Sequence, residues 1–542
     1  MIIIDLDKKM KQKLPLMLFI TGILIGSVFL VLQALTEQKI SYDDGISYLA
    51  ATGHQGAYHC EIPSNQWVPA HTWQSYWQPV AFGVFCTIGK DLATYDIHPP
   101  LYFWLLHIWI HIVGISLYTG PLLNGLLLIF TAIVIYFACY ILRCSHWVCA
   151  IIGVLWILNS TIVSVVTEVR PYCLLSLTAA CFISSLIYFL KKPSLRTCLL
   201  LGIISLTGIL THYHFGILLV ISVILAFIQL IKRSAWKDLL QMNISLVSAG
   251  VLFVALHPHF YTSFVHQQNK WRAVCWNNIP SCISHCMYTV FKIFIPYHVA
   301  YSVSNFMVKY WLFLLILIFI SLCLILIMKR KQFITYVSGI FFSIKALPIL
   351  SLIFTIAVLW ILFCSGMSPA HSMKVKYLML VYPLIFIVLG QFLNIVLQRW
   401  KINPGIVFLL LIIYQTSYGS PLRLNFKNNF EKQTITVMKE INDPVIIDSA
   451  GRGVIPPILW HVDPQVMIYA ANQKDILIQF PHLPDCDTLI YISNLRYNNT
   501  IKNHLHILRK FKNHDYKIFK LNKNIAVGSE LYTLTKSIRK TN

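Results

Sequence analysis

The sequence of 542 residues has little charge for its length. Charged residues make up only 12% of the chain and hydrophobic residues 57%, whereas about 25% of the residues of a soluble globular protein are charged. This composition excludes a cytosolic enzyme, a disordered protein and a coiled coil. Several apolar runs reach about 20 residues, the length that spans the hydrocarbon of a bilayer. We therefore expect an α-helical, polytopic membrane protein.

Acidic residues are especially scarce. Only 20 Asp and Glu stand against 43 Lys and Arg, which gives a formal net charge of +23. Such an excess is also found in proteins that bind nucleic acids. In a membrane protein, however, Lys and Arg gather in the cytoplasmic loops and set the orientation of the spans. We therefore expect membrane lipids, and no nucleic acid, as partners of these cations.

Cysteine motifs are absent as well. The 14 cysteines form neither a metal-type Cys-x-x-Cys pair nor the dense pattern of a disulfide framework. Most of them lie inside apolar runs, where cysteine acts as a small hydrophobic residue. Cys275, Cys282 and Cys286 lie in a segment that we expect outside the membrane, where a disulfide can form. Three cysteines leave the pairing open.

The basic loops predict the topology. Lysines precede the apolar stretch from Leu14 to Leu35, which is too long for a signal-peptide core and is expected to remain as the first span. Its basic flank places the N-terminus in the cytoplasm. We expect about eleven spans in all, the others at 121–142, 146–165, 171–190, 197–210, 214–231, 238–256, 309–328, 346–364, 377–398 and 405–419.

The apolar segment His98–Gly114 is expected not to cross the bilayer. A crossing there would place every later basic loop outside, so we interpret the segment as a helix at the interface, with His107 and His111 as interfacial polar groups. The loops 36–120 and 257–305 and the tail then lie outside. The aromatic residues of 67–77 are typical either of a belt at the membrane surface or of a platform for a sugar.

The composition changes after residue 419. Short β-rich runs separated by turns, together with a helix-like stretch at 501–511, predict a small α/β domain; the runs lie at 445–448, 466–469, 488–492, 516–521 and 530–534. We therefore divide the chain into a transmembrane domain at 1–419, with its first external loop at 36–120, and a soluble α/β extracytoplasmic domain at 420–542.

Ionisable residues gather at the external ends of the predicted spans. Charges near membrane segments cost about 2.5–3.5 kcal/mol on insertion scales and indicate function by default. A carboxylate can accept a proton from an attacking hydroxyl, whereas Arg, Lys and His can hold a phosphate leaving group. The pattern favours a reaction on a lipid-borne anion, and it consists of Asp43, Asp44, Asp96, His98, Glu168, Arg170, His212, His214, His257, His259, His371, Lys374 and Lys376.

Five segments between residues 1 and 400 resemble, in their order, the motifs of GT-C membrane glycosyltransferases. They are YDDGISYLA (42–50), DIHPPLYFWLLHIWIHIVG (96–114), TEVRPYCLLSL (167–177), LTHYHFG (210–216) and KYLMLVYP (376–383). This family includes protein O-mannosyltransferases, lipid A aminoarabinose transferases and galacturonosyltransferases, and it uses sugars carried on a polyprenyl phosphate. The resemblance implies a GT-C type fold with about eleven transmembrane helices and additional juxtamembrane helices.

The resemblance also implies a role for each matching residue. Asp43 matches the base that deprotonates the acceptor, and Asp44 stands where Glu is commoner. Lys376 replaces an Arg, which keeps the charge but loses the two-pronged guanidinium. The expected catalytic residues are Asp43, Asp44 and Asp96, of which Asp96 is a candidate for acceptor positioning or a metal contact. The expected substrate-binding residues are His98, Arg170, Tyr172, His212, Tyr213, Lys376 and Tyr377.

The implied activity is that of a hexosyl- or pentosyltransferase. It would move one sugar from a polyprenyl-phosphate donor to a lipid, glycan or protein acceptor, with inversion, at the external face of a membrane. A bacterial inner membrane with a periplasmic active site fits best. Whether a divalent cation such as Mg²⁺ or Mn²⁺ takes part stays open, because the family has members of both kinds.

Two other interpretations stay open. A proton-coupled lipid or polymer transporter could use the same carboxylates and histidines as a proton relay, although such proteins often have repeated halves and polar residues at the bilayer midplane. The individual residues also have structural interpretations: Asp43, Asp44 and Asp96 as helix caps, Arg170 as a side chain that reaches the interface, and His212 and His214 as satisfied polar groups.

Overall fold

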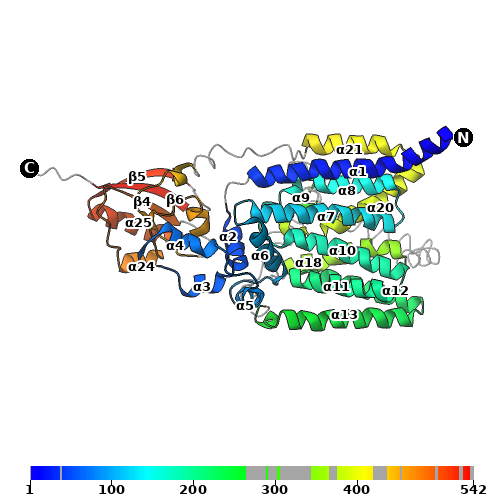
Figure 1. Cartoon of the computed structure of the whole chain (residues 1–542), viewed down its shortest axis with the longest axis horizontal. Helices are drawn as coiled ribbons and strands as arrows, with labels where there is room; N and C mark the ends of the chain where they lie inside the picture. The colour runs from blue at the N-terminus through cyan, green and yellow to red at the C-terminus, as the bar shows by residue number, and fades with distance from the viewer. Residues whose placement is uncertain are drawn as a thin grey trace, which may run out of the picture.

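The computed structural model describes residues 2–36, 40–263, 288–290, 302–304, 343–364, 375–418, 436–451, 455–494, 498–523 and 529–536. A bundle of long helices occupies one end of the molecule and a sheet the other, with short helices between them (Figure 1). The predicted span at 309–328, the cysteines Cys275, Cys282 and Cys286, and the residues His371 and Lys374 lie outside the described residues.

The bundle is that of an integral, multi-pass membrane protein. Within the described ranges, seven helices are long and apolar enough to cross a membrane. They lie in α1 (Ile2–Thr36), α7 (Thr119–Ile141), α10 (Tyr172–Lys191), α12 (Phe215–Lys232), α13 (Trp236–Leu256), α18 (Leu347–Cys364) and α20 (Tyr382–Trp400). Shorter apolar helices are α6 (Leu101–Val113), α8 (His146–Leu158), α11 (Leu195–Thr211) and α21 (Pro404–Tyr418).

One predicted span is interrupted. The single span expected at 146–165 is instead α8 followed by α9 (Ser160–Val163). Asn159 separates the two helices: its Oδ1 accepts hydrogen bonds from the backbone N–H groups of Thr161 and Ile162, both at 3.1 Å. An asparagine that caps the start of a helix satisfies donors that would otherwise be unpaired. The helix of the predicted span therefore ends at Leu158, and the chain continues through α9 into a loop ahead of α10.

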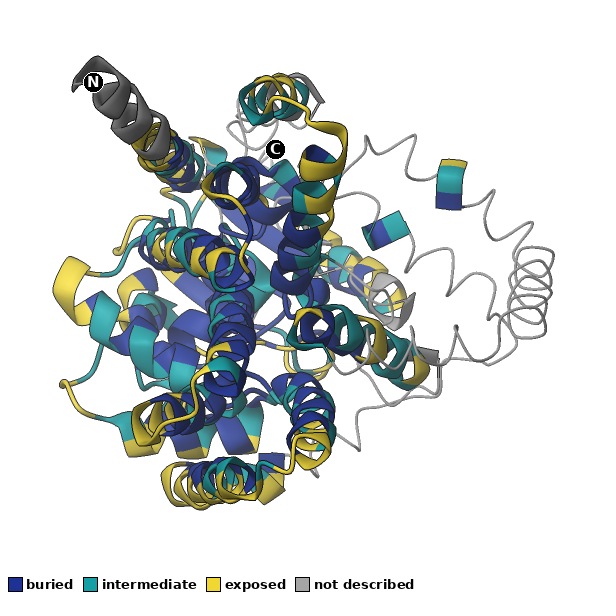
Figure 2. Cartoon of the chain, turned by 90° about the vertical axis from the view of Figure 1, so that its right-hand side faces the viewer, coloured by how far each residue is buried: buried dark blue, intermediate teal, exposed yellow. Residues whose placement is uncertain are grey.

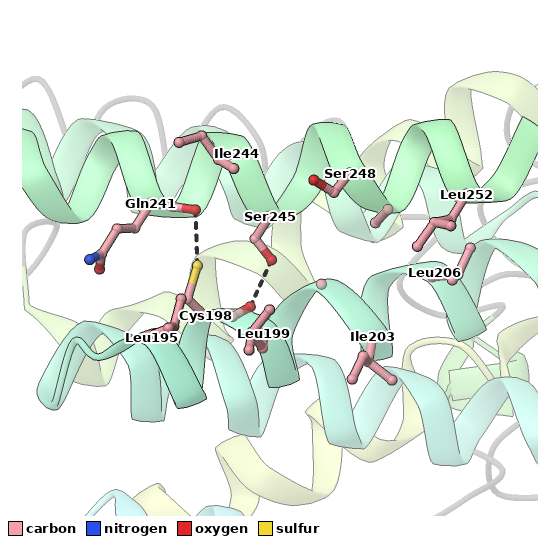
Figure 3. A pocket seen from close by; sticks show the side chains of 12 residues that line it. Leu195, Cys198, Leu199, Ile203, Leu206, Gln241, Ile244, Ser245, Ser248 and Leu252 are labelled. Carbon is pink, nitrogen blue, oxygen red and sulfur yellow. Dashed lines mark hydrogen bonds between the residues drawn. The ribbon is translucent and has the colours of Figure 1, made fainter.

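The interior of the bundle consists of closely packed apolar side chains. Viewed along the helices, buried residues face the interior and exposed residues the periphery (Figure 2). A Cβ atom at Gly153 of α8 would stand 2.4 Å from the Phe19 ring of α1, so only glycine allows this approach. At the edge of the bundle, α11 and α13 are joined by hydrogen bonds from Cys198 Sγ to Gln241 O and from Ser245 Oγ to Cys198 O (Figure 3). A cavity of about 230 Å³ lies beside these bonds.

Short helices from the first loop lie between the bundle and the sheet (Figure 1). They are α2 (Tyr42–Ala51), α3 (Gln55–Cys60), α4 (Ala70–Gln74), α5 (Phe85–Tyr95) and the longer α6. The helix α6 coincides with the segment predicted to lie at the interface. Its His107 is buried, with Nδ1 2.8 Å from the carbonyl oxygen of Ala51, and so ties α6 to α2.

Among the described residues, the sheet has six strands in the order β1-β3-β2-β4-β6-β5. The central strand β2 (Val445–Ile447) runs parallel to β3 (Met467–Ala470) and β4 (Thr488–Asn494). The strands β5 (Tyr516–Lys523) and β6 (Ser529–Lys536) continue the sheet in antiparallel fashion. The described helices of this region are α23 (Ile455–Leu459), α24 (Gln473–Ile478) and α25 (Asn498–Asn513). The five β-rich runs of the tail coincide with β2 to β6.

The remaining strand comes from the first loop and was not predicted. β1 (Trp67–Pro69) pairs antiparallel with β3, with Trp67 opposite Tyr469. The indole N–H of Trp67 donates to the carbonyl oxygen of His482 at 2.8 Å, and Trp73 and Trp77 are buried. Trp73 and Trp77 are therefore core residues and belong to neither a membrane belt nor a sugar platform, whereas Trp67 stays partly exposed.

Candidate functional site

Within the described residues, five charged side chains from four segments meet beside the first turn of α2. We call them the ion-pair cluster: Asp43 of α2, Asp96 at the end of α5, Glu168 and Arg170 of the loop before α10, and Lys376 of α19 (Val375–Leu378). The cluster lies where α7, α10, α12 and α20 begin and where α11 ends. The helix ends thus bring together charges that are far apart in the sequence.

The first turn of α2 is fixed by reciprocal hydrogen bonds. The Ser41 hydroxyl accepts from the Asp44 N–H at 3.2 Å, and the Asp44 carboxylate accepts from the Ser41 N–H at 2.9 Å. This pattern is a capping box, which satisfies backbone donors at the start of a helix. The other carboxylate oxygen of Asp44 accepts from the Val169 N–H at 2.7 Å. Asp44 therefore fastens the loop that carries Glu168 and Arg170 to α2.

Arg170 joins two carboxylates from different segments. Its guanidinium is 3.2 Å from the Asp43 carboxylate and 3.4 Å from the Asp96 carboxylate, and only 7% of its side chain is exposed. A buried charge is tolerated when it is paired. Burial disfavours the charged guanidinium, but Asp96 and Asp43 outweigh that effect and raise the pKa of Arg170. Arg170 is therefore a permanent cation of the cluster.

Lys376 is the second cation. Its Nζ lies 3.1 Å from Asp43 and 3.2 Å from Glu168. The ring centroids of Tyr172 and Tyr377 lie 5.6 and 5.8 Å away, in the range of cation–π attraction. Burial again disfavours the charge, but Glu168 and Asp43 raise the pKa of Lys376 above its ordinary value. Two tyrosines predicted to bind substrate thus flank the lysine.

Asp43 and Glu168 are the two accessible carboxylates of the cluster. Their side chains are 43% and 40% exposed, against 11% for Lys376. Partial burial favours the neutral form of Asp43, but the charges of Arg170 and Lys376 more than offset it and lower its pKa to about 2. Burial raises the pKa of Glu168. A substrate that approaches the cluster meets these two carboxylates in front of the cations.

Histidines adjoin the buried side of the cluster. His98 Nδ1 lies 2.9 Å from Asp96, and the His98 ring lies 5.5 Å from the His212 ring. The His212 ring also lies 6.0 Å from Tyr172 and 4.7 Å from His214. Burial, aided by the neighbouring histidines, lowers the pKa of His212 well below its ordinary value and that of His214 to about 4. Both rings are therefore neutral at neutral pH.

Most of the predicted site residues form one contiguous group. Asp43, Asp96, His98, Arg170 and Lys376 are linked by ion pairs, and Tyr172, Tyr377 and His212 join them through ring contacts. Tyr213 points elsewhere, with its hydroxyl 3.0 Å from His257 Nε2 at the end of α13. Glu168 was among the ionisable residues expected at the external ends of the spans, but it had no predicted catalytic or substrate-binding role; the structure pairs it with Lys376.

The cluster differs from a metal centre in its donors. Within the ranges that the structure describes, no three His, Cys, Asp or Glu side chains are arranged to hold a metal ion. Arg170 and Lys376 occupy the space between the carboxylates of Asp43, Asp96 and Glu168. Chemically, such a group can offer a carboxylate base beside two fixed cations, which suits a proton transfer close to a developing negative charge.

Comparison with known proteins gave structural similarities. No family model matches the chain, and no curated protein sequence matches it. The crystal structure of ArnT from Cupriavidus metallidurans bound to undecaprenyl phosphate has a TM-score of 0.52 and 9% identity, over 95% of this chain and 97% of that chain. ArnT in the apo state gives 0.52 and 10%, over 96% and 97%. An Archaeoglobus fulgidus oligosaccharyltransferase complex with Zn and sulfate gives 0.44 and 10%, over 87% and 67%.

The similarity to ArnT covers nearly the full length of both chains, from the helical bundle to the sheet. At this level of identity it establishes the fold and leaves the activity to be argued from the site. The chain therefore has the same overall fold as ArnT, in agreement with the fold that its sequence motifs implied.

Proposed function

We propose that this protein is a glycosyltransferase that moves a single sugar from a polyprenyl-phosphate donor to an acceptor hydroxyl. The observation that carries the proposal is the position of Asp43, a partly exposed carboxylate held between Arg170 at 3.2 Å and Lys376 at 3.1 Å. A base and two cations at one point match the needs of glycosyl transfer from a phosphate. The ArnT structure with undecaprenyl phosphate supports the class of carrier.

The reaction is a single displacement. The acceptor oxygen forms a bond to the anomeric carbon of the sugar while the bond from that carbon to the phosphate oxygen breaks. Asp43 takes the acceptor proton, and the released polyprenyl phosphate leaves with one more negative charge than it had in the donor. Arg170 and Lys376 stabilise that charge, as positioned cations do in other transfers. Attack from the side opposite the phosphate inverts the anomeric configuration.

The ion pairs also link donor binding to the strength of the base. With a pKa of about 2, Asp43 of the free protein is a weak base because Arg170 and Lys376 stabilise its ionised form. A donor phosphate that shares these cations weakens their hold on Asp43 and raises its pKa. The base therefore becomes stronger when the donor is in place, which favours transfer to the acceptor in the ternary complex.

The placement of the charges supports an external site. The helix α10 begins at Tyr172 beside the ion-pair cluster and ends at Lys191, and α12 likewise ends at Lys232. The basic loops thus lie at the end of the bundle away from the cluster. By the positive-inside rule these loops are cytoplasmic, so we place the reaction at the external face, which in a bacterium is the periplasmic face of the inner membrane.

We also propose the division into a membrane domain at 1–419 and an extracytoplasmic α/β domain at 420–542. The strands β2 to β6 support this division, and β1 shows where the first loop at 36–120 joins the sheet. A lipid, a glycan or a protein remains the acceptor class in the proposal. A hexose and a pentose are both compatible with the cluster, because its charged groups do not distinguish one sugar from another.

The test is transfer by Asp43→Asn in liposomes that contain the purified full-length protein, a polyprenyl-phosphate sugar and candidate acceptors. Loss of a positioned base lowers the rate by about 10²–10⁴-fold, so we expect transfer to fall by that factor. Asp238→Asn, at the basic end of α13, is the matched control and should retain wild-type transfer. Full activity of Asp43→Asn would exclude Asp43 as the base. Counterflow of labelled lipid without transfer would favour a transporter.

A further inference from the structure

We infer that the segment from Ile455 to Trp460, which comprises α23 and the residue after it, is a positioning element for α2 and thereby for Asp43. The inference rests on the proposed function, in which Asp43 is the base. We call the part of the chain that holds β2 to β6 and α23 the sheet module. Through this segment the sheet module contributes to catalysis without having to bind an acceptor. The contacts that carry the inference join the segment to α2 and to the first loop, so it acts through the helix that carries the base.

The closest contact joins Gly45 of α2 to Pro456 of α23. A Cβ atom at Gly45 would stand 2.9 Å from both the Cβ and the Cγ of Pro456. Real Cβ atoms do not approach other carbons so closely, so the two helices touch at a point where α2 has no side chain. Gly45 directly follows Asp44 and lies two residues after Asp43. The proline ring therefore lies against the first turn of α2.

A second contact is made by aromatic rings. Trp460 lies 5.7 Å from the ring of Tyr48 and 6.2 Å from the ring of Trp77. Tyr48 is fully buried, and its hydroxyl donates to Ser116 O and accepts from the Gly120 N–H, both at 3.0 Å. Tyr48 is thus held between Trp460 on one side and the start of α7 on the other. This arrangement fixes the rotation of α2 about its axis.

The segment is itself anchored to the first loop. The side-chain amide of Gln74 donates to the carbonyl oxygens of Leu459 and Val462, each at 2.9 Å. The Tyr58 hydroxyl donates to Ala450 O at 3.5 Å, and β1 pairs with β3. Because these anchors lie on both sides of α23, the module cannot move away from α2 without breaking several of them.

These contacts decide how firmly α2 is held. The helix has ten residues, and isolated helices shorter than about 12–15 residues are marginal in water. Its stability therefore depends on packing, on the bundle side through Tyr48 and on the outer side through Pro456 and Trp460. A misplacement of about 1 Å at a reacting group costs about 10²-fold in rate. Loosening this contact should lower kcat without changing the cations that bind the donor.

The experiment introduces a methyl group into the contact and then makes room for it. Gly45→Ala is compared with Pro456→Gly, with the double variant, and with Gly250→Ala as the matched control, since a Cβ at Gly250 meets nothing within 4 Å. All are measured as full-length proteins in liposomes by kcat, by KM for the donor, and by amide hydrogen exchange of residues 42–51. The variant Trp460→Ala, with Trp460→Phe as its conservative partner, probes the second contact.

Gly45→Ala should lower kcat by about 10- to 100-fold, with KM for the donor changed by less than about 2-fold, because Lys376 lies on α19 and Arg170 is also held by Asp96. It should also speed exchange of α2. The direction of the change in exchange rate is informative. Alanine favours helix more than glycine does, so the substitution would slow exchange if α23 did not pack against α2 at Gly45. The double variant should regain most of the kcat, and Gly250→Ala should behave as wild type.

Wild-type kcat and wild-type or slower exchange in Gly45→Ala would overturn the inference, as would a double variant no better than Gly45→Ala. Unchanged exchange and kcat in Trp460→Ala would overturn the part assigned to the tryptophan. If the wild-type protein transfers no sugar from any donor, the proposed function fails. The exchange data then still decide whether α23 positions α2, so the two failures are distinguishable.

Discussion

Asp43 and Asp44 show that neighbouring residues of one helix can have different contacts and different roles. The two residues are adjacent and chemically alike, but Asp43 faces Arg170 and Lys376, whereas both oxygens of Asp44 accept hydrogen bonds from backbone N–H groups. Burial raises the pKa of Asp44, and the neighbouring cations lower that of Asp43 to about 2. The contacts of Asp44 fit the helix-cap interpretation, and we propose that it positions the loop before α10.

Lys376, like Asp44, is a residue at which this chain departs from the motifs that it resembles. An arginine offers a two-pronged guanidinium, whereas a lysine offers one compact charge. Here that single charge lies 3.1 Å from Asp43 and 3.2 Å from Glu168, so it forms ion pairs with carboxylates from two segments at once. Removal of the charge should therefore affect both carboxylates, and through Asp43 it should also change the pH dependence of transfer.

The prediction at this scale concerns the pH profile of Lys376→Gln. The ion pairs keep Asp43 ionised below its ordinary pKa of 3.8; their contribution to stability is fully present above that pH and is lost as the pH falls through about 2. Without the lysine charge the pKa of Asp43 rises. The acidic limb of kcat/KM should move to higher pH, and kcat/KM at neutral pH should fall on the order of 10- to 100-fold.

The measurement is kcat/KM for the donor between acidic and neutral pH, because this ratio reports the ionisation of groups in the free enzyme. Lys376→Arg keeps the charge and should leave the limb near its wild-type position. Glu168 also loses its partner in Lys376→Gln, and its pKa shifts in the same direction. An acidic limb that stays in place in Lys376→Gln would show that Lys376 does not hold the base.

At the scale of elements, the spans could largely be predicted because an apolar run of sufficient length is a local property of the sequence. The break in the predicted span at 146–165 could not, since Asn159 is one polar residue in a long apolar run. Its capping of α9 depends on backbone geometry that composition does not reveal. This break matters because it releases the loop in which Glu168 and Arg170 lie.

The capping box of α2 gives a prediction at this scale. Ser41→Ala removes the hydroxyl that accepts from the Asp44 N–H at 3.2 Å, which should cost about 1 kcal/mol of unfolding free energy and lower the rate of transfer. Ser194→Ala removes an equivalent capping hydroxyl, also at 3.2 Å, from α11 at the basic end of the bundle. It should cost similar stability and leave transfer unchanged.

Thermal unfolding in detergent and transfer in liposomes, measured on the same two preparations, provide the comparison. Because the two caps are alike, the two alanine variants should lose similar stability. A difference in their rates of transfer therefore reports where the cap lies, and not how much stability it contributes. Ser41→Thr, which keeps a capping hydroxyl, should behave as wild type. Equal transfer by Ser41→Ala and Ser194→Ala would mean that the order of the first turn of α2 does not matter to the site.

At the scale of the whole molecule, the topology makes a prediction for labelling. Cys60 and Cys86 are exposed and lie in the first loop, on the side of the ion-pair cluster. We expect both to react with a membrane-impermeant maleimide added outside to right-side-out vesicles, because the loop 36–120 is predicted to be external. A cysteine introduced as Lys237→Cys, beside the basic loop before α13, should react only after the vesicles are permeabilised.

Peptide mapping by mass spectrometry assigns each label to its cysteine, which separates Cys60 and Cys86 from the other cysteines of the chain. Denatured protein gives the full extent of labelling as a reference. Labelling of Lys237→Cys in intact vesicles, with Cys60 and Cys86 protected until permeabilisation, would invert the orientation and place the site in the cytoplasm.

The sequence by itself determined most of the long apolar helices that the structure describes, the strands β2 to β6 and most residues of the ion-pair cluster, because runs, alternation and motifs are written along the chain. Only the tertiary structure decided that Glu168 shares Lys376, that β1 of the first loop completes the sheet, and that Pro456 lies against Gly45. Each of these depends on distant segments: Lys376 and Asp43 are 333 positions apart. Such pairings follow from how helices and strands pack in space, a property that no local pattern encodes.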